Sequence, residues 1–118
     1  MTETIQLAQQ LIQIDSVTPN DKGCQKMIAD YLKPMDFKIE NMKFGEVDNI
    51  WARRGTESPC LVFAGHTDVV PTGPESAWTH PPFSAHIDGD MMFGRGTADM
   101  KSSIACFMAA SKRFVSEY

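Results

Sequence analysis

Two short segments of the sequence carry side chains that can bind metal ions. The first, residues 65–71, contains His66 and Asp68 directly after an apolar stretch. Residues two apart in extended backbone face the same side, so both side chains can point into one site. A metal-binding imidazole is neutral and commonly donates its second N–H to a carboxylate. A His-x-Asp after a strand is also typical of an exposed histidine beside a turn aspartate, and this segment alone does not decide between the two.

The second segment, residues 94–101, places Asp99 just before an expected helix. Its glycines allow the backbone to turn sharply and to approach other segments closely. Aspartate in that place commonly caps the helix N-terminus. Its two oxygens can instead bridge two cations about 3.5 to 4 Å apart. The local sequence favours the cap and leaves the bridge open.

The two segments together resemble the paired signatures of the zinc aminoacylase and carboxypeptidase family. The motifs that carry this resemblance are Gly65-His66-Thr67-Asp68-Val69-Val70-Pro71-Thr72-Gly73, Trp78 with Pro81-Pro82-Phe83, and Gly94-Arg95-Gly96 with Ala98-Asp99-Met100-Lys101. Their order and separation match as well. Within the family, residues 16–19, 50–56 and 103–107 are closest to the branch that hydrolyses N-succinyl-LL-2,6-diaminopimelate. The similarity covers essentially the whole chain.

The resemblance implies a role for each of three residues. His66 is expected to bind one zinc ion and Asp99 to bridge two. Asp68 is expected to act in catalysis by orienting His66 from the side of the ring that faces away from the metal. The peptide bond after Asp99 is expected to be cis. The cofactor implied is two zinc ions per full-length subunit, for which cobalt can substitute.

These residues do not complete a catalytic site. A catalytic zinc ion normally has three protein ligands and a water molecule. The family takes its other ligands and its glutamate general base from an adjacent Glu-Glu pair and later positions, and this sequence has no such pair. His80 and His86 lie in or beside a loop and are expected at the surface. We therefore expect residues 1–118 to be the N-terminal portion of a catalytic domain, inactive alone, with the downstream catalytic half and the dimerisation domain absent.

The function implied for the parent enzyme is hydrolysis of N-succinyl-LL-2,6-diaminopimelate to succinate and LL-2,6-diaminopimelate, in lysine and diaminopimelate biosynthesis. Metal-bound water would attack the amide while the missing glutamate takes its proton. The alternative among enzymes is an acetylornithine deacetylase-like or other zinc aminoacyl amidase. The alternative from another class is a non-catalytic folding or binding module. The parent is expected to be a homodimer, and the fragment is expected to self-associate through uncovered apolar surface.

Hydrophobic spacing predicts the elements that must position the site. Helical spacing predicts helices over 3–13, around 24–32 with Asn20 or Asp21 as N-cap, and from about 100 to the end. Alternation predicts a hairpin around 37–52, and the turn at 88–90 predicts a second, shorter one. The unbroken apolar run 60–64 predicts a central strand covered on both faces. This order predicts an α/β fold, a partial catalytic domain with a mixed sheet sandwiched by helices.

Composition indicates a globular chain and limits its partners. The chain has 118 residues, 42% hydrophobic content and a net charge of -4, so no nucleic acid or membrane is expected as a partner. The sequence has neither a membrane-length apolar run nor a signal-like N-terminus, so the cytoplasm is expected. Cys24, Cys60 and Cys106 are expected to be reduced core residues. Lys101 is expected to be a solvated residue in the first turn of a helix.

Overall fold

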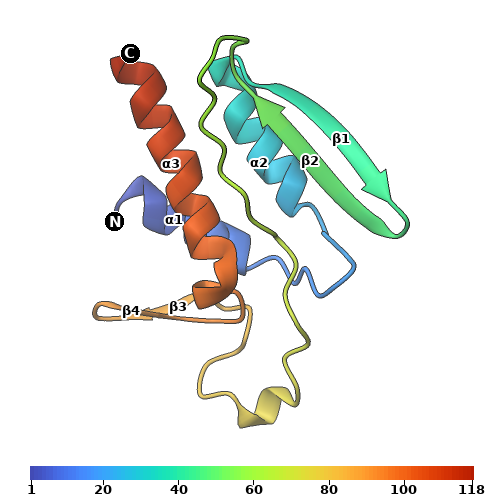
Figure 1. Cartoon of the computed structure of the whole chain (residues 1–118). Coiled ribbons are helices and arrows are strands. Elements are labelled where there is room, and N and C mark those ends of the chain that lie inside the picture. The colour runs from blue at the N-terminus through green and yellow to red at the C-terminus, as the bar shows by residue number, and fades with distance from the viewer.

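The computed structural model describes residues 1–118 and combines three helices with two small antiparallel sheets (Figure 1). The helices are α1 (Glu3–Ile12), α2 (Cys24–Leu32) and α3 (Ser102–Glu117). The strands are β1 (Lys38–Phe44), β2 (Val47–Arg53), β3 (His86–Asp88) and β4 (Met91–Phe93). Short helical turns, η1 (Lys33–Met35), η2 (Glu75–Ala77) and η3 (Thr97–Lys101), complete the chain. The expected α/β class and all three predicted helices are confirmed.

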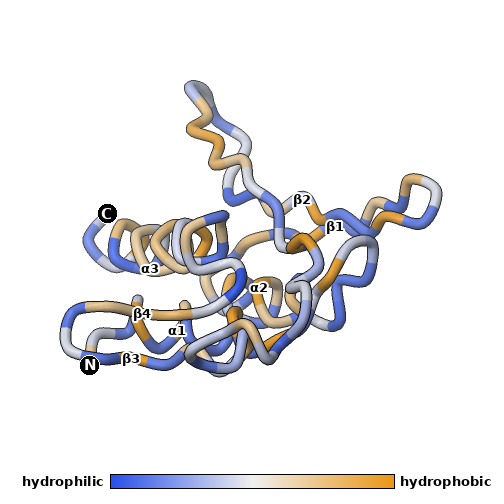
Figure 2. Tube along the Cα trace, turned by 90° about the horizontal axis from the view of Figure 1, so that it is seen from below, coloured by the Kyte–Doolittle hydropathy of each residue, from blue (hydrophilic) through white to orange (hydrophobic).

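The core lies between the three helices. Each helix has one apolar face, and in Figure 2 the tube of α3 alternates between hydrophobic and hydrophilic along its turns. Leu11 and Ile12 of α1 are fully buried, and Ile104 and Met108 of α3 are nearly so. Residues 11 and 12 also form the last turn of α1, so the best-buried part of the core adjoins the loop that follows it.

The two hairpins form where the sequence predicts them. β1 pairs with β2 in an antiparallel register that sets Phe44 opposite Val47, so Gly45 and Glu46 make a tight turn. β3 pairs with β4 in the same way, with Asp88 opposite Met91. The two hairpins belong to separate sheets. Residues 71–83 between them form a loop with only η2 in it.

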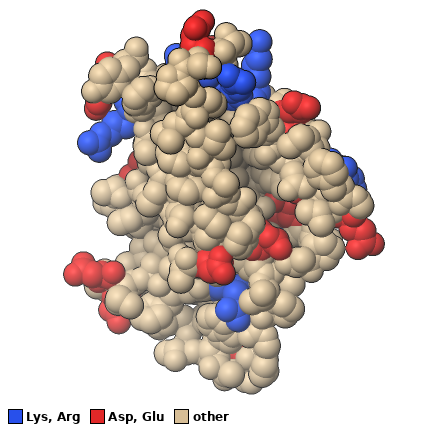
Figure 3. All heavy atoms as spheres, in the orientation of Figure 1, with Lys and Arg blue, Asp and Glu red and all other residues tan.

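The prediction of a buried central strand over residues 60–64 is wrong for this chain. No strand forms there, and Leu61 is 82% exposed, with Val62 and Phe63 about half exposed. A strand needs a neighbour for its backbone N–H and C=O groups, and neither sheet pairs with this segment. Phe63 instead stacks on Phe107 of α3, with ring centroids 4.5 Å apart. Figure 3 shows few charged side chains across the centre of this face.

The start of α2 differs slightly from the prediction. The N-cap residue is Gly23, whose φ of 97° lies in the left-handed region, rather than Asn20 or Asp21. The Asp21 carboxylate nevertheless accepts hydrogen bonds from the backbone N–H groups of Gly23 and Gln25, at 3.2 and 3.0 Å. The predicted capping chemistry is therefore present, displaced by two residues along the chain.

Lys101 is buried, and the expectation of a solvated side chain is wrong. Its Nζ donates to the carbonyl oxygens of Leu11 and Ile14, at 2.8 and 2.6 Å. Carbonyls at the end of a helix lack intrahelical donors, and an ammonium group meets both that need and the negative end of the helix dipole. Burial lowers the pKa of the Lys101 ammonium from its ordinary value. The lysine thus joins the start of α3 to the end of α1.

The cysteines are all free, as expected, but only Cys24 is a core residue. Cys60 and Cys106 are exposed. Cys60 is exposed because the segment that contains it forms no buried strand. None of the helices combines the length and the hydrophobicity that crossing a membrane requires.

We predict that Lys101→Met lowers the free energy of unfolding by about 1–3 kcal/mol, because two charge-assisted hydrogen bonds are lost in a buried place. Urea denaturation followed by circular dichroism measures the change. The matched control is Lys43→Met, which removes only an exposed ion pair with Asp48 and should cost less than about 1 kcal/mol. Equal effects of the two substitutions would contradict the structural role of Lys101.

Candidate metal site

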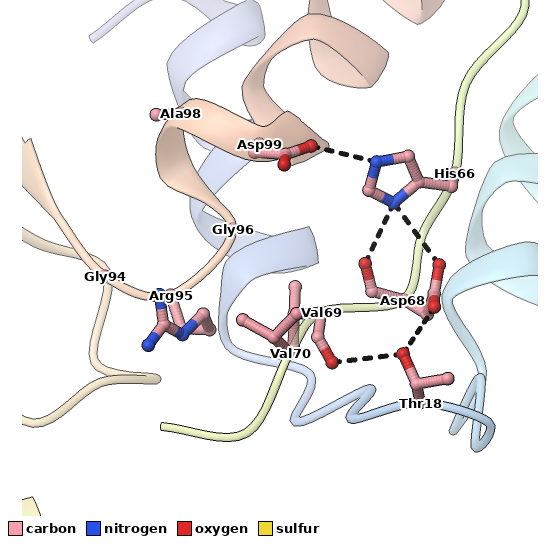
Figure 4. A pocket seen from close by; sticks show the side chains of 10 residues that line it. All are labelled: Thr18, His66, Asp68, Val69, Val70, Gly94, Arg95, Gly96, Ala98 and Asp99. Carbon is pink, nitrogen blue, oxygen red and sulfur yellow. Dashed lines mark hydrogen bonds and ion pairs between the residues drawn. The ribbon is translucent and has the colours of Figure 1, made fainter. Parts of the chain in front are cut away.

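The site forms where three segments meet. Residues 66–69 run beside residues 16–18, and η3 faces them (Figure 4). The first two segments form an isolated parallel bridge between Val17 and Val69. Within it, Val69 N–H donates to Ser16 O at 2.9 Å and Thr18 N–H donates to Val69 O at 3.0 Å. These backbone bonds fix the loop that carries the first predicted segment.

Gly96 allows η3 to approach this loop. Its φ is 89°, a conformation that suits glycine, and a Cβ there would lie 2.9 Å from Cγ1 of Val69. Any side chain at position 96 would push the two segments apart. The glycine-rich sequence before Asp99 therefore serves the close approach that its composition predicts.

The His66 ring points from residues 66–69 toward η3 and has oxygen atoms next to both of its nitrogens. Its Nδ1 is 3.0 Å from the carbonyl oxygen of Asp68 and 3.3 Å from Oδ1 of the same residue. Its Nε2 is 2.9 Å from Oδ1 of Asp99. The structure thus brings together all three residues singled out from the sequence, His66, Asp68 and Asp99.

This arrangement of acceptors demands a positive charge. With two oxygens at Nδ1, the neutral ring places its hydrogen there. The Nε2 lone pair then faces the Asp99 carboxylate, and two electron-rich atoms cannot approach so closely without a proton or a cation between them. A proton is the simplest solution, and the oxygen atoms that favour the protonated ring raise the pKa of His66. The main cause of that shift is the hydrogen bond to the Asp68 carbonyl, with a further contribution from Asp99, and burial opposes both.

Asp99 does not cap α3, so the local expectation of a capping role is wrong. The residue before α3 is Lys101, and no side chain there caps the helix. Asp99 has φ -133° and ψ 95°, an extended conformation that turns its carboxylate away from the helix end and toward His66. The peptide bond between Asp99 and Met100 is cis, as predicted.

Asp68 has a second partner that the sequence did not reveal. The Thr18 hydroxyl donates a hydrogen bond to Oδ2 of Asp68. Residues 18 and 68 are 50 positions apart, and no spacing rule links them. The only signal was that residues 16–19 share in the family resemblance. Sequence reasoning therefore missed Thr18 as a member of the site.

The remaining candidates do not act as ligands here. His80 and His86 lie away from the pocket and stack on each other with ring centroids 3.9 Å apart. Arg95 lines the pocket but donates from Nη2 to Pro71 O at 3.3 Å, and its guanidinium lies over the Trp78 ring. It pairs with no carboxylate. It ties the loop before β3 to the turn that precedes η3.

The donor set fits part of a metal site. An imidazole nitrogen and a carboxylate oxygen are ordinary zinc ligands, and two ligands on a tetrahedral zinc ion lie about 3.3 Å apart, given bonds near 2.0–2.1 Å. The 2.9 Å between Nε2 and Asp99 Oδ1 needs to widen only slightly. No group of three or more His, Cys, Asp and Glu residues within the chain could hold a metal ion. Two donors are half of a site, and others must complete it.

Comparison with known proteins agrees with this geometry. Residues 62–118, which contain both candidate segments, match the description of peptidase family M20/M25/M40. An M20 family metallo-carboxypeptidase from Sulfolobus solfataricus shares the fold, with a TM-score of 0.87 and 22% identity over 99% of this chain and 28% of that one.

Alignments with individual relatives cover the whole chain. A succinyl-diaminopimelate desuccinylase from Hydrogenovibrio crunogenus is 73% identical over 100% of this chain and 32% of its own length. One from Vesicomyosocius okutanii is 54% identical over 100% of this chain and 31% of its own length. The chain therefore spans about a third of the length of the curated relatives it matches. The resemblance seen in the sequence is confirmed.

We predict that the pKa of His66 lies above the ordinary value of about 6.5 and falls toward it in Asp99→Asn, because the variant removes the negative charge at Nε2. NMR titration of the ring measures both values. Because the folded-state pKa is raised, the stabilisation is complete below about pH 6.5 and is lost as the pH rises through the folded-state value. Asp88→Asn, outside the site, is the matched control and should leave the His66 titration unchanged.

Proposed function

We propose that this chain supplies one side of a dinuclear zinc site in an enzyme that hydrolyses N-succinyl-LL-2,6-diaminopimelate to succinate and LL-2,6-diaminopimelate. The observation that carries the proposal is the approach of His66 Nε2 to the Asp99 carboxylate, two zinc ligands 2.9 Å apart that need to separate only slightly to admit a cation. The names of the relatives at 73% and 54% identity support the substrate. Such an enzyme would act in lysine and diaminopimelate biosynthesis, in the cytoplasm and as a homodimer.

Each residue has a distinct part in the proposed site. His66 would bind one zinc ion through Nε2 after that nitrogen loses its proton. Asp99 would bind through its carboxylate, which has a second oxygen free for a second ion. Asp68 would hold the Nδ1–H, which fixes the tautomer and raises the basicity of the ligand nitrogen. Zinc, or cobalt in its place, would act as a Lewis acid and lower the pKa of bound water.

The reaction needs groups beyond these 118 residues. Two zinc ions that share one bridging carboxylate still need several donors, and a general base must take the proton from the attacking water. The chain brings one imidazole and one carboxylate to the site. We therefore propose that the isolated chain does not hydrolyse the substrate, and that activity belongs to a protein as long as the relatives.

A chimera tests the proposed activity. We predict that this chain, exchanged for the aligned third of the Hydrogenovibrio crunogenus relative, gives an enzyme that releases succinate from N-succinyl-LL-2,6-diaminopimelate. In the same chimera His66→Ala should lower kcat/KM by at least about 10-fold, because losing a ligand costs no less than losing the group that orients it. His80→Ala, outside the pocket, is the matched control and should keep the activity.

The same assay separates the alternatives. Faster hydrolysis of N-acetylornithine than of the succinylated substrate would replace the proposal with an acetylornithine deacetylase-like activity. A folded chimera that hydrolyses neither compound would favour a non-catalytic module.

We also predict that the 118-residue chain binds Zn²⁺ through His66 and Asp99. Histidine ¹⁵N shifts on addition of zinc should change at Nε2 of His66, and Asp99→Asn should weaken binding by about tenfold or more, since a charged donor is lost. Asp90→Asn, in the β3–β4 turn, is the control. Zinc-induced shifts confined to His80 and His86 would contradict the assignment of the site.

A further inference from the structure

We infer that Thr18 is a positioning residue of the proposed metal site. Its hydroxyl holds the Asp68 carboxylate in the orientation that faces His66. The inference rests on the proposed function, because it concerns how one ligand of that site is oriented. Neither the family match, which begins at residue 62, nor the paired motifs include Thr18.

The hydrogen bonds around Asp68 form a short chain. The Thr18 hydroxyl has one proton, and it donates this proton to Oδ2 of Asp68. The hydroxyl also lies 3.3 Å from Val69 O, a longer and weaker contact. With Oδ2 held, Oδ1 of Asp68 lies 3.3 Å from Nδ1 of His66. Figure 4 shows this sequence of contacts running from Thr18 through Asp68 to the ring.

Asp68 needs such a partner because it is not confined by its surroundings. Its side chain is 44% exposed, so solvent competes for the carboxylate and leaves it free to rotate. A carboxylate that orients a ligand histidine works only in one orientation. The hydroxyl supplies the one protein hydrogen bond that the structure gives to Oδ2 of Asp68.

The backbone holds Thr18 in place independently of its side chain. Thr18 N–H donates to Val69 O at 3.0 Å, and Val69 N–H donates to Ser16 O at 2.9 Å. Thr18 is itself exposed. Replacing the side chain by valine, which has the same shape, therefore removes the hydroxyl and leaves the position of the segment unchanged.

A neighbouring residue provides a control for a merely structural role. The Ser16 hydroxyl donates to Thr67 O at 2.7 Å and is buried. It joins the same two segments as Thr18 but does not touch Asp68. Ser16→Ala should therefore destabilise the chain without changing the orientation of the Asp68 carboxylate.

The experiment uses the metal-free 118-residue chain and ¹⁵N NMR of His66 at about pH 9, where the ring is neutral. In Thr18→Val we expect the shift of His66 Nδ1 to change while its hydrogen stays there, since the Asp68 carbonyl at 3.0 Å still accepts it and only the carboxylate at 3.3 Å is released. Added Zn²⁺ should bind about 3- to 10-fold more weakly, below the 10- to 100-fold typical of losing the orienting group itself. Thr18→Ser, which keeps the hydroxyl, should restore the His66 nitrogen shifts and bring the zinc affinity to within about twofold of the native value. Ser16→Ala should lower Tm and leave the His66 nitrogens unchanged.

Three results would overturn the inference. They are unchanged His66 shifts and zinc affinity in Thr18→Val, the same loss in Thr18→Ser as in Thr18→Val, and an equal shift in Ser16→Ala. Failure of the proposed function gives a different pattern. In that case the chimera with the native sequence hydrolyses no substrate, while the His66 nitrogen shifts measured in the metal-free chain still decide the role of Thr18.

Discussion

A single histidine ring with oxygen acceptors at both of its nitrogens is the constraint on which the rest of this structure depends. Neutral imidazole can satisfy one side only, so the ring must either carry a second proton or face a metal ion. The surrounding elements hold those oxygen atoms next to the ring. The 16–18 segment fixes the backbone of residues 66–69, and Gly96 lets η3 come close enough for Asp99 to reach Nε2.

The helices and hairpins could be predicted because their signals are local. Apolar spacing in α1 and α3, and tight-turn residues at Gly45 and Gly89, determine structure within a few residues. The run at 60–64 has an equally clear apolar signal, but a strand is completed by its neighbours, and none lies beside it. Lys101 was misjudged for a similar reason, since its acceptors lie about ninety positions away.

Some contacts of the candidate site could likewise be predicted from local sequence, and others could not. The pairing of His66 with Asp68 follows from their spacing, because residues two apart share a side of an extended chain. The convergence of His66 with Asp99 was anticipated only through family resemblance, since local features at Asp99 favoured a helix cap. The extended conformation of Asp99 itself, at φ -133° and ψ 95°, is what turns the carboxylate to the ring. The contact of Thr18 with Asp68 could not be predicted, because the two residues are 50 positions apart and the resemblance of residues 16–19 gave no role to any one of them.

The Lys101 ammonium has a consequence for the order in which the molecule assembles. The first helix is synthesised early, yet the cation that neutralises its carboxyl end follows 90 residues after Leu11. Until Lys101 leaves the ribosome, water must hydrate the carbonyl groups at the end of the helix. The contact that joins this helix end to the start of α3 cannot form before then. Closure of this long loop sets Asp99, two positions earlier, against the histidine ring. The candidate metal site and the carboxyl end of the amino-terminal helix should therefore form in one cooperative step once Lys101 has left the ribosome, rather than as successive stages.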